Sequence, residues 1–246
     1  MKAFEDKVVL VTGGGTGIGK ATAVAFLAEG ARVVIAGRRQ STLEATTSEL
    51  GDSVHFVVAD VSKSGEPKAL VDETVAKFGQ LDVLVNNAGT LTMGPLTETS
   101  DEDIERVYRT NVFALLAVSR EALPHLIKTK GSIINISSTA SKGVMANTSV
   151  YSSSKAAVDH MTRILAAEYG PDGVRINAVA PGLVATDMSA GVRSDDQTLA
   201  MMVEQTPMGR IGEPSDIANA VLLLAGDEAG WITGQVVQAS GGMAFG

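Results

Sequence analysis

The sequence TGGGTGIGK at residues 12–20 joins an apolar run, Val8 to Val11, to a segment with apolar residues at helical spacing, such as Val24 and Leu27. Glycines let the chain turn tightly, so that backbone amides and the positive end of the helix meet a pyrophosphate. A plain tight turn between a strand and a helix has the same composition. The spacing G-x-G-x-x-G does not fit, whereas T-G-x-x-x-G-x-G does.

Short β-branched runs alternate with longer amphipathic segments along the whole chain. Strand and helix repeated six times with right-handed crossovers predict an open parallel sheet covered by helices on both faces. We therefore predict an α/β chain with a single doubly wound Rossmann domain over residues 1–246 and a seven-stranded parallel sheet. Ligands of such sheets bind at the carboxyl ends of the strands. The expected strands are residues 8–11, 32–36, 54–58, 83–85, 132–136, 175–179 and 235–238.

Composition excludes several classes of protein. With 45% hydrophobic but only 4% aromatic residues, the core is expected to be aliphatic, as in a buried parallel sheet. The sequence has no cysteine, no apolar run of eighteen residues and no signal peptide, so we expect a cytoplasmic protein with neither disulfides nor a membrane span. A net charge of -8 disfavours binding to nucleic acid or to a membrane. His55, His125 and His160 lack the spacing of a metal site, so no metal is expected.

The second strand ends in AGRR at residues 36–39, where an NAD-binding fold usually has an acid for the ribose hydroxyls. Gly37 leaves room there, and the guanidinium groups of Arg38 and Arg39 suit a 2′-phosphate, which predicts NADP(H). The alternative is a solvated turn with two surface arginines. Asp60-Val61, after the third strand, suits the adenine end, although Asp60 is also a candidate helix cap.

Tyr151 and Lys155 lie four residues apart in a predicted helix and therefore share one face. A phenol is a poor base at neutral pH, and a nearby ammonium in a partly dry site favours the phenolate. Ser138 follows the fifth strand, where its hydroxyl could bond a substrate oxygen on which charge develops. A Ser-Ser-Thr sequence such as residues 137–139 is also common in caps and loops.

These residues together make the chain resemble a classical short-chain dehydrogenase/reductase over essentially its whole length. The family's T-G-x-x-x-G-x-G, its N-N-A-G at residues 86–89 and its Asn-Ser-Tyr-Lys tetrad are matched in order. The resemblance implies a catalytic tetrad of Asn111, Ser138, Tyr151 and Lys155, in which Asn111 holds a water of a proton relay and Lys155 also binds the nicotinamide ribose. The residues expected to bind NADP(H) are Gly13, Thr16, Gly17, Ile18, Gly19, Arg38, Arg39, Asp60, Val61, Asn87, Ala88, Gly89, Tyr151, Lys155, Pro181, Gly182, Val184 and Thr186, of which Thr186 is assigned to the nicotinamide carboxamide.

The family pattern also divides the chain and shows two departures. It implies a cofactor-binding part at about 1–135, and a catalytic and substrate-lid part at about 136–246. Thr16 replaces a basic residue in the glycine loop, so selectivity for the 2′-phosphate rests on Arg38 with Arg39 as a weaker helper. SGG at residues 240–242 replaces the usual Asp-Gly-Gly. Four methionines after Thr186 suit an adaptable lid, or else ordinary core packing: Met188, Met201, Met202 and Met208.

The expected reaction interconverts a ketone or aldehyde and an alcohol on a small hydrophobic substrate, with NADP(H) as hydride carrier and Tyr151 as general acid and base. One alternative is a 3-oxoacyl-[acyl-carrier-protein] reductase, against which Ser132 and Asp172 replace arginines of carrier reductases, while Lys128 and Lys130 lie nearby. A remote alternative is an NADP(H) sensor without catalysis. The resemblance also implies a homotetramer in which the helices after Asn111 and Tyr151 pair.

Overall fold

In the computed structural model, which describes residues 2–243, seven parallel strands form one sheet in the order β3-β2-β1-β4-β5-β6-β7. The predicted fold class is confirmed, and each predicted strand boundary lies within two residues of the observed one. The strand order reverses between β1 and β4, which pair directly. The strands are β1 (Val8–Thr12), β2 (Arg32–Gly37), β3 (Val54–Val58), β4 (Val83–Asn86), β5 (Ser132–Ile136), β6 (Arg175–Pro181) and β7 (Val236–Ala239).

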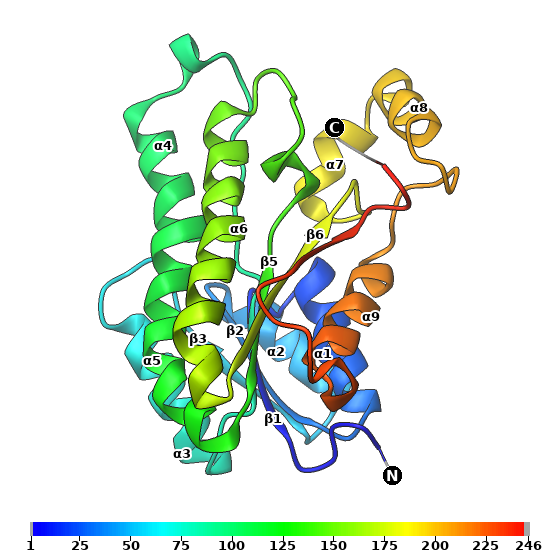
Figure 1. Ribbon diagram of the computed structural model, residues 1–246. Helices are drawn as coiled ribbons and strands as arrows, with labels where there is room; N and C mark the ends of the chain where they lie inside the picture. Colours follow the sequence, from blue (N-terminus) through cyan, green and yellow to red (C-terminus); the bar gives the residue numbers. More distant parts are fainter. Residues whose placement is uncertain (1, 244–246) are drawn as a thin grey trace.

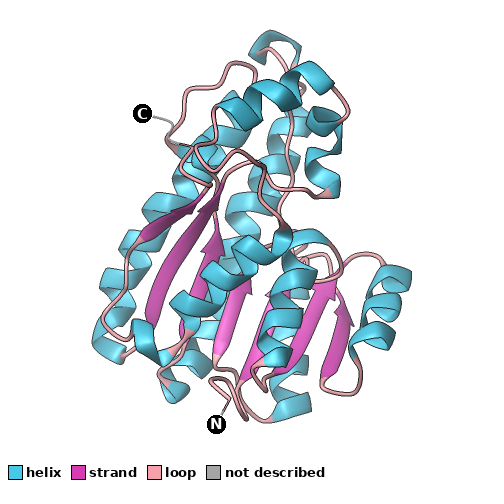
Figure 2. Cartoon of the chain, turned by 90° about the vertical axis from the view of Figure 1, so that its right-hand side faces the viewer, coloured by secondary structure: helices cyan, strands magenta, loops and turns pink. Residues whose placement is uncertain are grey.

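Helices cover both faces of the sheet. On one face, α1 and α9 pack against each other and against the strands, with Phe26 and Ile217 in the shared core; on the other, α3 and α5 contribute Leu70 and Leu123 (Figures 1 and 2). The helices are α1 (Gly17–Ala28), α2 (Gln40–Leu50), α3 (Glu66–Phe78), α4 (Asp101–Tyr108), α5 (Ala114–Thr129), α6 (Ser149–Tyr169), α7 (Ala190–Arg193), α8 (Asp196–Glu204) and α9 (Pro214–Ala225).

The turn from β1 into α1 requires glycine at two positions. Gly13 has a φ of 65°, and a Cβ there would lie 2.9 Å from Asn87 Nδ2. A Cβ on Gly19 would lie 2.2 Å from the carbonyl oxygen of Gly13, far inside contact distance. The Oγ1 atom of Thr12 accepts hydrogen bonds from the backbone N–H groups of Asn87 and Ala88, both at 3.0 Å. The ends of β1 and β4 are thereby held together where the strand order reverses.

The part of the chain beyond β6 forms a small cap. A short η5 turn (Asp187–Ser189), α7 and α8 lie above the carboxyl ends of the strands and extend away from the sheet (Figure 1). Within residues 2–243, no helix combines the length and the apolar character needed to cross a membrane.

Candidate active site

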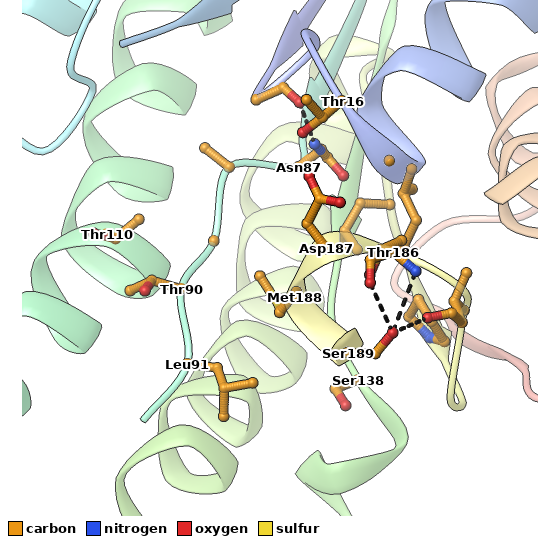
Figure 3. Close-up of a pocket in the computed structure, with 18 of the residues that line it drawn as sticks. Thr16, Asn87, Thr90, Leu91, Thr110, Ser138, Thr186, Asp187, Met188 and Ser189 are labelled. Carbon is orange, nitrogen blue, oxygen red and sulfur yellow. Dashed lines mark hydrogen bonds between the residues drawn. The ribbon is translucent and has the colours of Figure 1, made fainter. Parts of the chain in front are cut away.

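A cleft of about 530 Å³ opens along the carboxyl ends of the strands. Figure 3 shows Thr16 and Asn87 in one part of it, and Leu91, Ser138 and Met188 in another. Among the predicted site residues, all but Gly19 and Asn111 line this cleft. Gly19 is buried in the tight turn, and Asn111 lies behind the surface of the cleft, 2% exposed. The structure thus brings most residues predicted to bind the cofactor and three members of the predicted tetrad to one cleft, with Asn111 behind its surface.

The cleft begins at the amino-terminal end of α1. Thr16 is the N-cap residue, but no side chain caps the first turn of this helix. The first N–H groups of a helix have no partner inside it, and they attract anions. Gly17 lines the cleft with a φ of 51°, and a Cβ on it would lie 3.2 Å from Thr186 Cγ2. The uncapped N–H groups and the absence of a side chain at Gly17 suit a phosphate group at this end of the helix.

The end of β2 offers positive charge and free space. Arg38 and Arg39 are exposed on the cleft, and neither forms a salt bridge with a carboxylate of residues 2–243. The nearest neighbour of a Cβ built on Gly37 is Leu43 at 3.5 Å, an ordinary contact. The cleft at the end of β2 therefore has room and positive charge for a phosphate, or room for a larger side chain at position 37.

Asp60 does not cap a helix, so that alternative is wrong: α3 begins at Glu66, and its N-cap is Gly65. The Asp60 carboxylate instead accepts hydrogen bonds from the backbone and hydroxyl of Ser62, at 3.1 and 2.6 Å. Burial tends to raise the pKa of Asp60, but these bonds and the charge of Arg38 lower it below the usual value. The Asp60 carboxylate therefore belongs to a turn after β3 and lines the cleft in its ionised form.

Tyr151 and Lys155 come from the first two turns of α6. The Lys155 ammonium donates a hydrogen bond to the carbonyl oxygen of Ile136 at 2.8 Å and lies 5.9 Å from the centroid of the Tyr151 ring. Burial lowers the pKa of Lys155 to about 8, against the charge of Asp159. Burial also raises the pKa of Tyr151, while a hydrogen bond with Ser138 acts in the opposite direction. In the chain alone, the effect of burial on the Tyr151 pKa therefore outweighs that of the Ser138 hydrogen bond, and the activation of the phenol by Lys155 stays a prediction.

Ser138 serves as a cap and also lines the cleft. It precedes a short turn, η3 (Thr139–Ser141), and its Oγ atom accepts a hydrogen bond from the N–H of Ala140 at 3.1 Å. Its hydroxyl interacts with Tyr151 as well. The interpretation of this sequence as a cap is therefore confirmed, and a contact of Ser138 with a substrate oxygen stays a prediction. The strand β5 places Ser138, and the helix α6 places its partner.

Asn111 lies in a π-helical segment, η2 (Arg109–Phe113), between α4 and α5. Such segments often occur at functional sites. Its Oδ1 atom accepts from the N–H of Thr90 at 2.8 Å, and its Nδ2 atom donates to the Thr90 carbonyl and to Ser154 Oγ at 2.9 and 3.0 Å. The Asn111 amide thus fastens the loop after β4 to α6, beside the cleft.

The methionines after Thr186 lie mainly at the surface. Met188, Met201 and Met208 are exposed, so ordinary core packing is wrong for these three; Met188 and Met202 line the cleft. Thr186 is held by its neighbours. Its N–H donates to Ser189 Oγ at 3.2 Å (Figure 3), and its carbonyl accepts from Arg193 at 2.8 Å. The cap therefore places the flexible side chains of Met188 and Met202 in the cleft, while hydrogen bonds hold the backbone of Thr186.

Sequence reasoning missed part of the apolar lining. Leu91 and Met93 follow β4, and Met145 precedes α6. They lie in irregular segments, where no periodicity marks which side chains face inward. Among residues 2–243, no group of three or more His, Cys, Asp or Glu residues is arranged to hold a metal ion.

The chain is similar to known oxidoreductases over nearly its whole length. A family model described as "Enoyl-(Acyl carrier protein) reductase" matches residues 13–244. The chain is 37% identical over 240 residues to the meso-2,3-butanediol dehydrogenase of Serratia marcescens, covering 97% of this chain and 95% of that protein. It is 36% identical over 246 residues to the 3-oxoacyl-[acyl-carrier-protein] reductase of Thermotoga maritima, covering 98% of each.

A solved structure has the same fold. This is a short-chain type dehydrogenase/reductase from Mycobacterium ulcerans, which superposes with a TM-score of 0.94 at 34% identity. The match covers 98% of this chain and 90% of that one. The names of the two enzymes above describe different substrates, so similarity alone selects none of them.

Proposed function

Because the chain belongs to the short-chain dehydrogenase/reductase family of oxidoreductases, whose members use NAD(H) or NADP(H), we propose that it interconverts a ketone or aldehyde and an alcohol on a small hydrophobic substrate, with NADP(H). One observation supports this most strongly. Tyr151, Ser138 and Lys155 line the apolar part of the same cleft whose other part presents Arg38 and an uncapped helix end.

In the proposed reaction, bound NADP(H) supplies or accepts the hydride. The Tyr151 hydroxyl donates a proton to the substrate oxygen during reduction and takes it back during oxidation. Ser138, which interacts with Tyr151, donates a hydrogen bond to that oxygen as charge develops on it. Lys155 contributes a positive charge beside the phenol and binds the nicotinamide ribose. Asn111 supports them by holding the loop after β4 against α6.

The proposed division of labour follows the chain. The part at about 1–135 contributes the uncapped end of α1, the arginines after β2 and Asp60-Val61 to the phosphates and adenine. The part at about 136–246 contributes most of the tetrad, Thr186 for the carboxamide, and the cap over the substrate. We propose NADP(H) rather than NAD(H) because the end of β2 has no acid and has two exposed guanidinium groups that form no salt bridge within residues 2–243.

We propose a free small molecule as the substrate, because the cleft beside Tyr151 is lined by apolar side chains. Reduction of a 3-oxoacyl group on a carrier protein stays the second candidate, because the relative from Thermotoga maritima is named for that reaction. Ser132 is 1% exposed inside β5, so it is not part of a docking surface, and the expectation that it opposes a carrier is wrong. Asp172, Lys128 and Lys130 are exposed, but they precede β6 and β5 at the amino ends of the strands and do not line the cleft, so their charges do not decide between the two candidates.

A substrate panel tests this proposal. We expect the purified protein to oxidise NADPH with small apolar ketones, aldehydes or quinones, and to show kcat/KM values for a carrier-bound 3-oxoacyl thioester no higher than for its small thioester analogue. A large gain with the carrier attached would establish the second candidate. A non-catalytic NADP(H) sensor would bind NADPH and consume it with no member of the panel.

We also propose a homotetramer in which α5 and α6 pair across one dimer interface. Phe113, Leu116 and Ile164 are exposed apolar residues on η2, α5 and α6. Exposed apolar residues that gather on neighbouring elements are typical of a contact between proteins. Light scattering after size-exclusion chromatography should give four times the mass of the chain, and a monomer mass would contradict the proposal.

A further inference from the structure

One turn beyond Lys155, α6 has a second charged side chain that the proposed reaction does not use. Asp159 is 4% exposed, and it lies on the same buried face as Lys155 and Ser154. Burial of a carboxylate is costly unless hydrogen bonds and an opposite charge compensate for it. The groups that compensate for the burial of Asp159 therefore indicate its role.

Both oxygens of the Asp159 carboxylate bind serines of the segment that contains Ser138. Oδ1 accepts a hydrogen bond from Ser137 Oγ, and Oδ2 accepts one from Ser141 Oγ at 2.6 Å. Ser137 and Ser141 lie on either side of Ser138 along the chain. The carboxylate thus fastens the segment at both ends to the helix that contains Tyr151 and Lys155, although these residues come from different elements.

Asp159 also affects the charge of Lys155. The groups near the Lys155 ammonium from β5 and the loop after β4 are uncharged: the Ile136 carbonyl and Gly89. Asn111 of η2, which also lies beside Gly89, is uncharged as well. On α6 itself, Tyr151 and Asp159 are the titratable neighbours. Burial lowers the pKa of Lys155 to about 8, and the negative charge of Asp159 opposes that effect.

We propose, on the basis of the function proposed above, that Asp159 is a positioning residue of this reaction. Its carboxylate holds Ser138 in register with Tyr151 and places a negative charge one turn from Lys155 on the same buried face of α6. Asp159 touches neither substrate nor reacting atoms, and it acts through the residues that do.

Two variants separate the two effects. Asp159→Asn keeps an acceptor and a donor for the two serines and removes the charge. Ser137→Ala combined with Ser141→Ala keeps the charge and removes both links. Glu168→Gln is the matched control, because it removes one acidic charge from an exposed position on the same helix.

For Asp159→Asn, we expect the high-pH decline of kcat/KM for reduction to move to lower pH by about 1 unit, because the ammonium loses its proton more readily without the carboxylate. The ¹³Cε resonance of Lys155, assigned through its loss in Lys155→Met, should titrate lower by a similar amount. For the serine double variant, kcat should fall about tenfold or more at an unchanged NADPH dissociation constant, since Ser138 loses its alignment. Glu168→Gln should show none of these changes.

Unchanged pH profile and Lys155 titration in folded Asp159→Asn would overturn the charge role, and an unchanged kcat in the serine variant would overturn the positioning role. If near-ultraviolet circular dichroism shows that Asp159→Asn does not fold, the serine variant alone decides whether Asp159 positions Ser138. If the wild type consumes no NADPH with any carbonyl, the proposed function fails. The Lys155 titration still tests Asp159 in that case, because it needs no turnover.

Discussion

Replacement of Tyr151 by Phe is expected to lower kcat by about a thousandfold, while NADPH affinity stays within a few-fold. The change removes the proposed proton donor, and positioned acid-base groups contribute on the order of 10² to 10⁴ in rate. It keeps the ring, so its packing beside Lys155 is preserved. Stopped-flow measurement of NADPH oxidation, with NADPH binding followed by fluorescence titration, separates the two quantities.

Tyr169→Phe provides the control for this variant. Tyr169 is the last residue of the same helix and does not line the cleft. It packs against the core cluster that contains Leu123 and Leu126 of α5. Its loss of a hydroxyl should leave kcat unchanged. If purified Tyr151→Phe retained substantial reductase activity, another group would have to supply the proton, and the assignment of Tyr151 would be wrong.

The sequence sufficed for the sheet because the strands are short and rich in β-branched residues, and the central strands are buried. β1 is buried on both faces of the sheet, which is why Val8 to Val11 form a continuous apolar run. β5 is buried equally, but it includes Ser132 and Asn135, whose side chains are hydrogen-bonded. The glycine spacing of residues 12–20 was equally informative, since Gly13 and Gly19 are required by contacts that a Cβ would violate. The motifs also predicted that Ser138, Tyr151 and Lys155 belong to one site, and all three line the same cleft.

Other features depend on tertiary contacts that no local pattern specifies. In α1, Val24 is 42% exposed, although its spacing suggested a helix face with Leu27; the buried face instead contains Ala23 and Phe26. Gly19 sets this rotation, because it approaches the Gly13 carbonyl. Likewise, the spacing of Lys155 from Tyr151 could not show that its ammonium binds the Ile136 carbonyl.

The choice of cofactor is the second test with a large expected effect. We expect the wild type to prefer NADPH, and Gly37→Asp combined with Arg38→Leu to reverse that preference. A charge-assisted bond from a guanidinium to the 2′-phosphate contributes about 1.5 to 3 kcal/mol. This corresponds to roughly a tenfold to hundredfold preference, which Arg39 extends if it binds as well. The reversal should therefore exceed that factor.

The structure makes the double variant feasible, because a Cβ on Gly37 would meet Leu43 at 3.5 Å and the backbone there is not left-handed. The new carboxylate would repel the 2′-phosphate and accept hydrogen bonds from the ribose hydroxyls of NADH, so both cofactors are affected in opposite directions. Both arginines are exposed, so rising ionic strength should weaken the NADPH preference. We would compare kcat/KM for NADPH and NADH at low and moderate salt, with Arg163→Leu as a control that removes an exposed charge outside the cleft. Equal use of both cofactors by the wild type, or an unchanged ratio in the double variant, would show that Arg38 and Arg39 are surface charges without a role in selecting the cofactor.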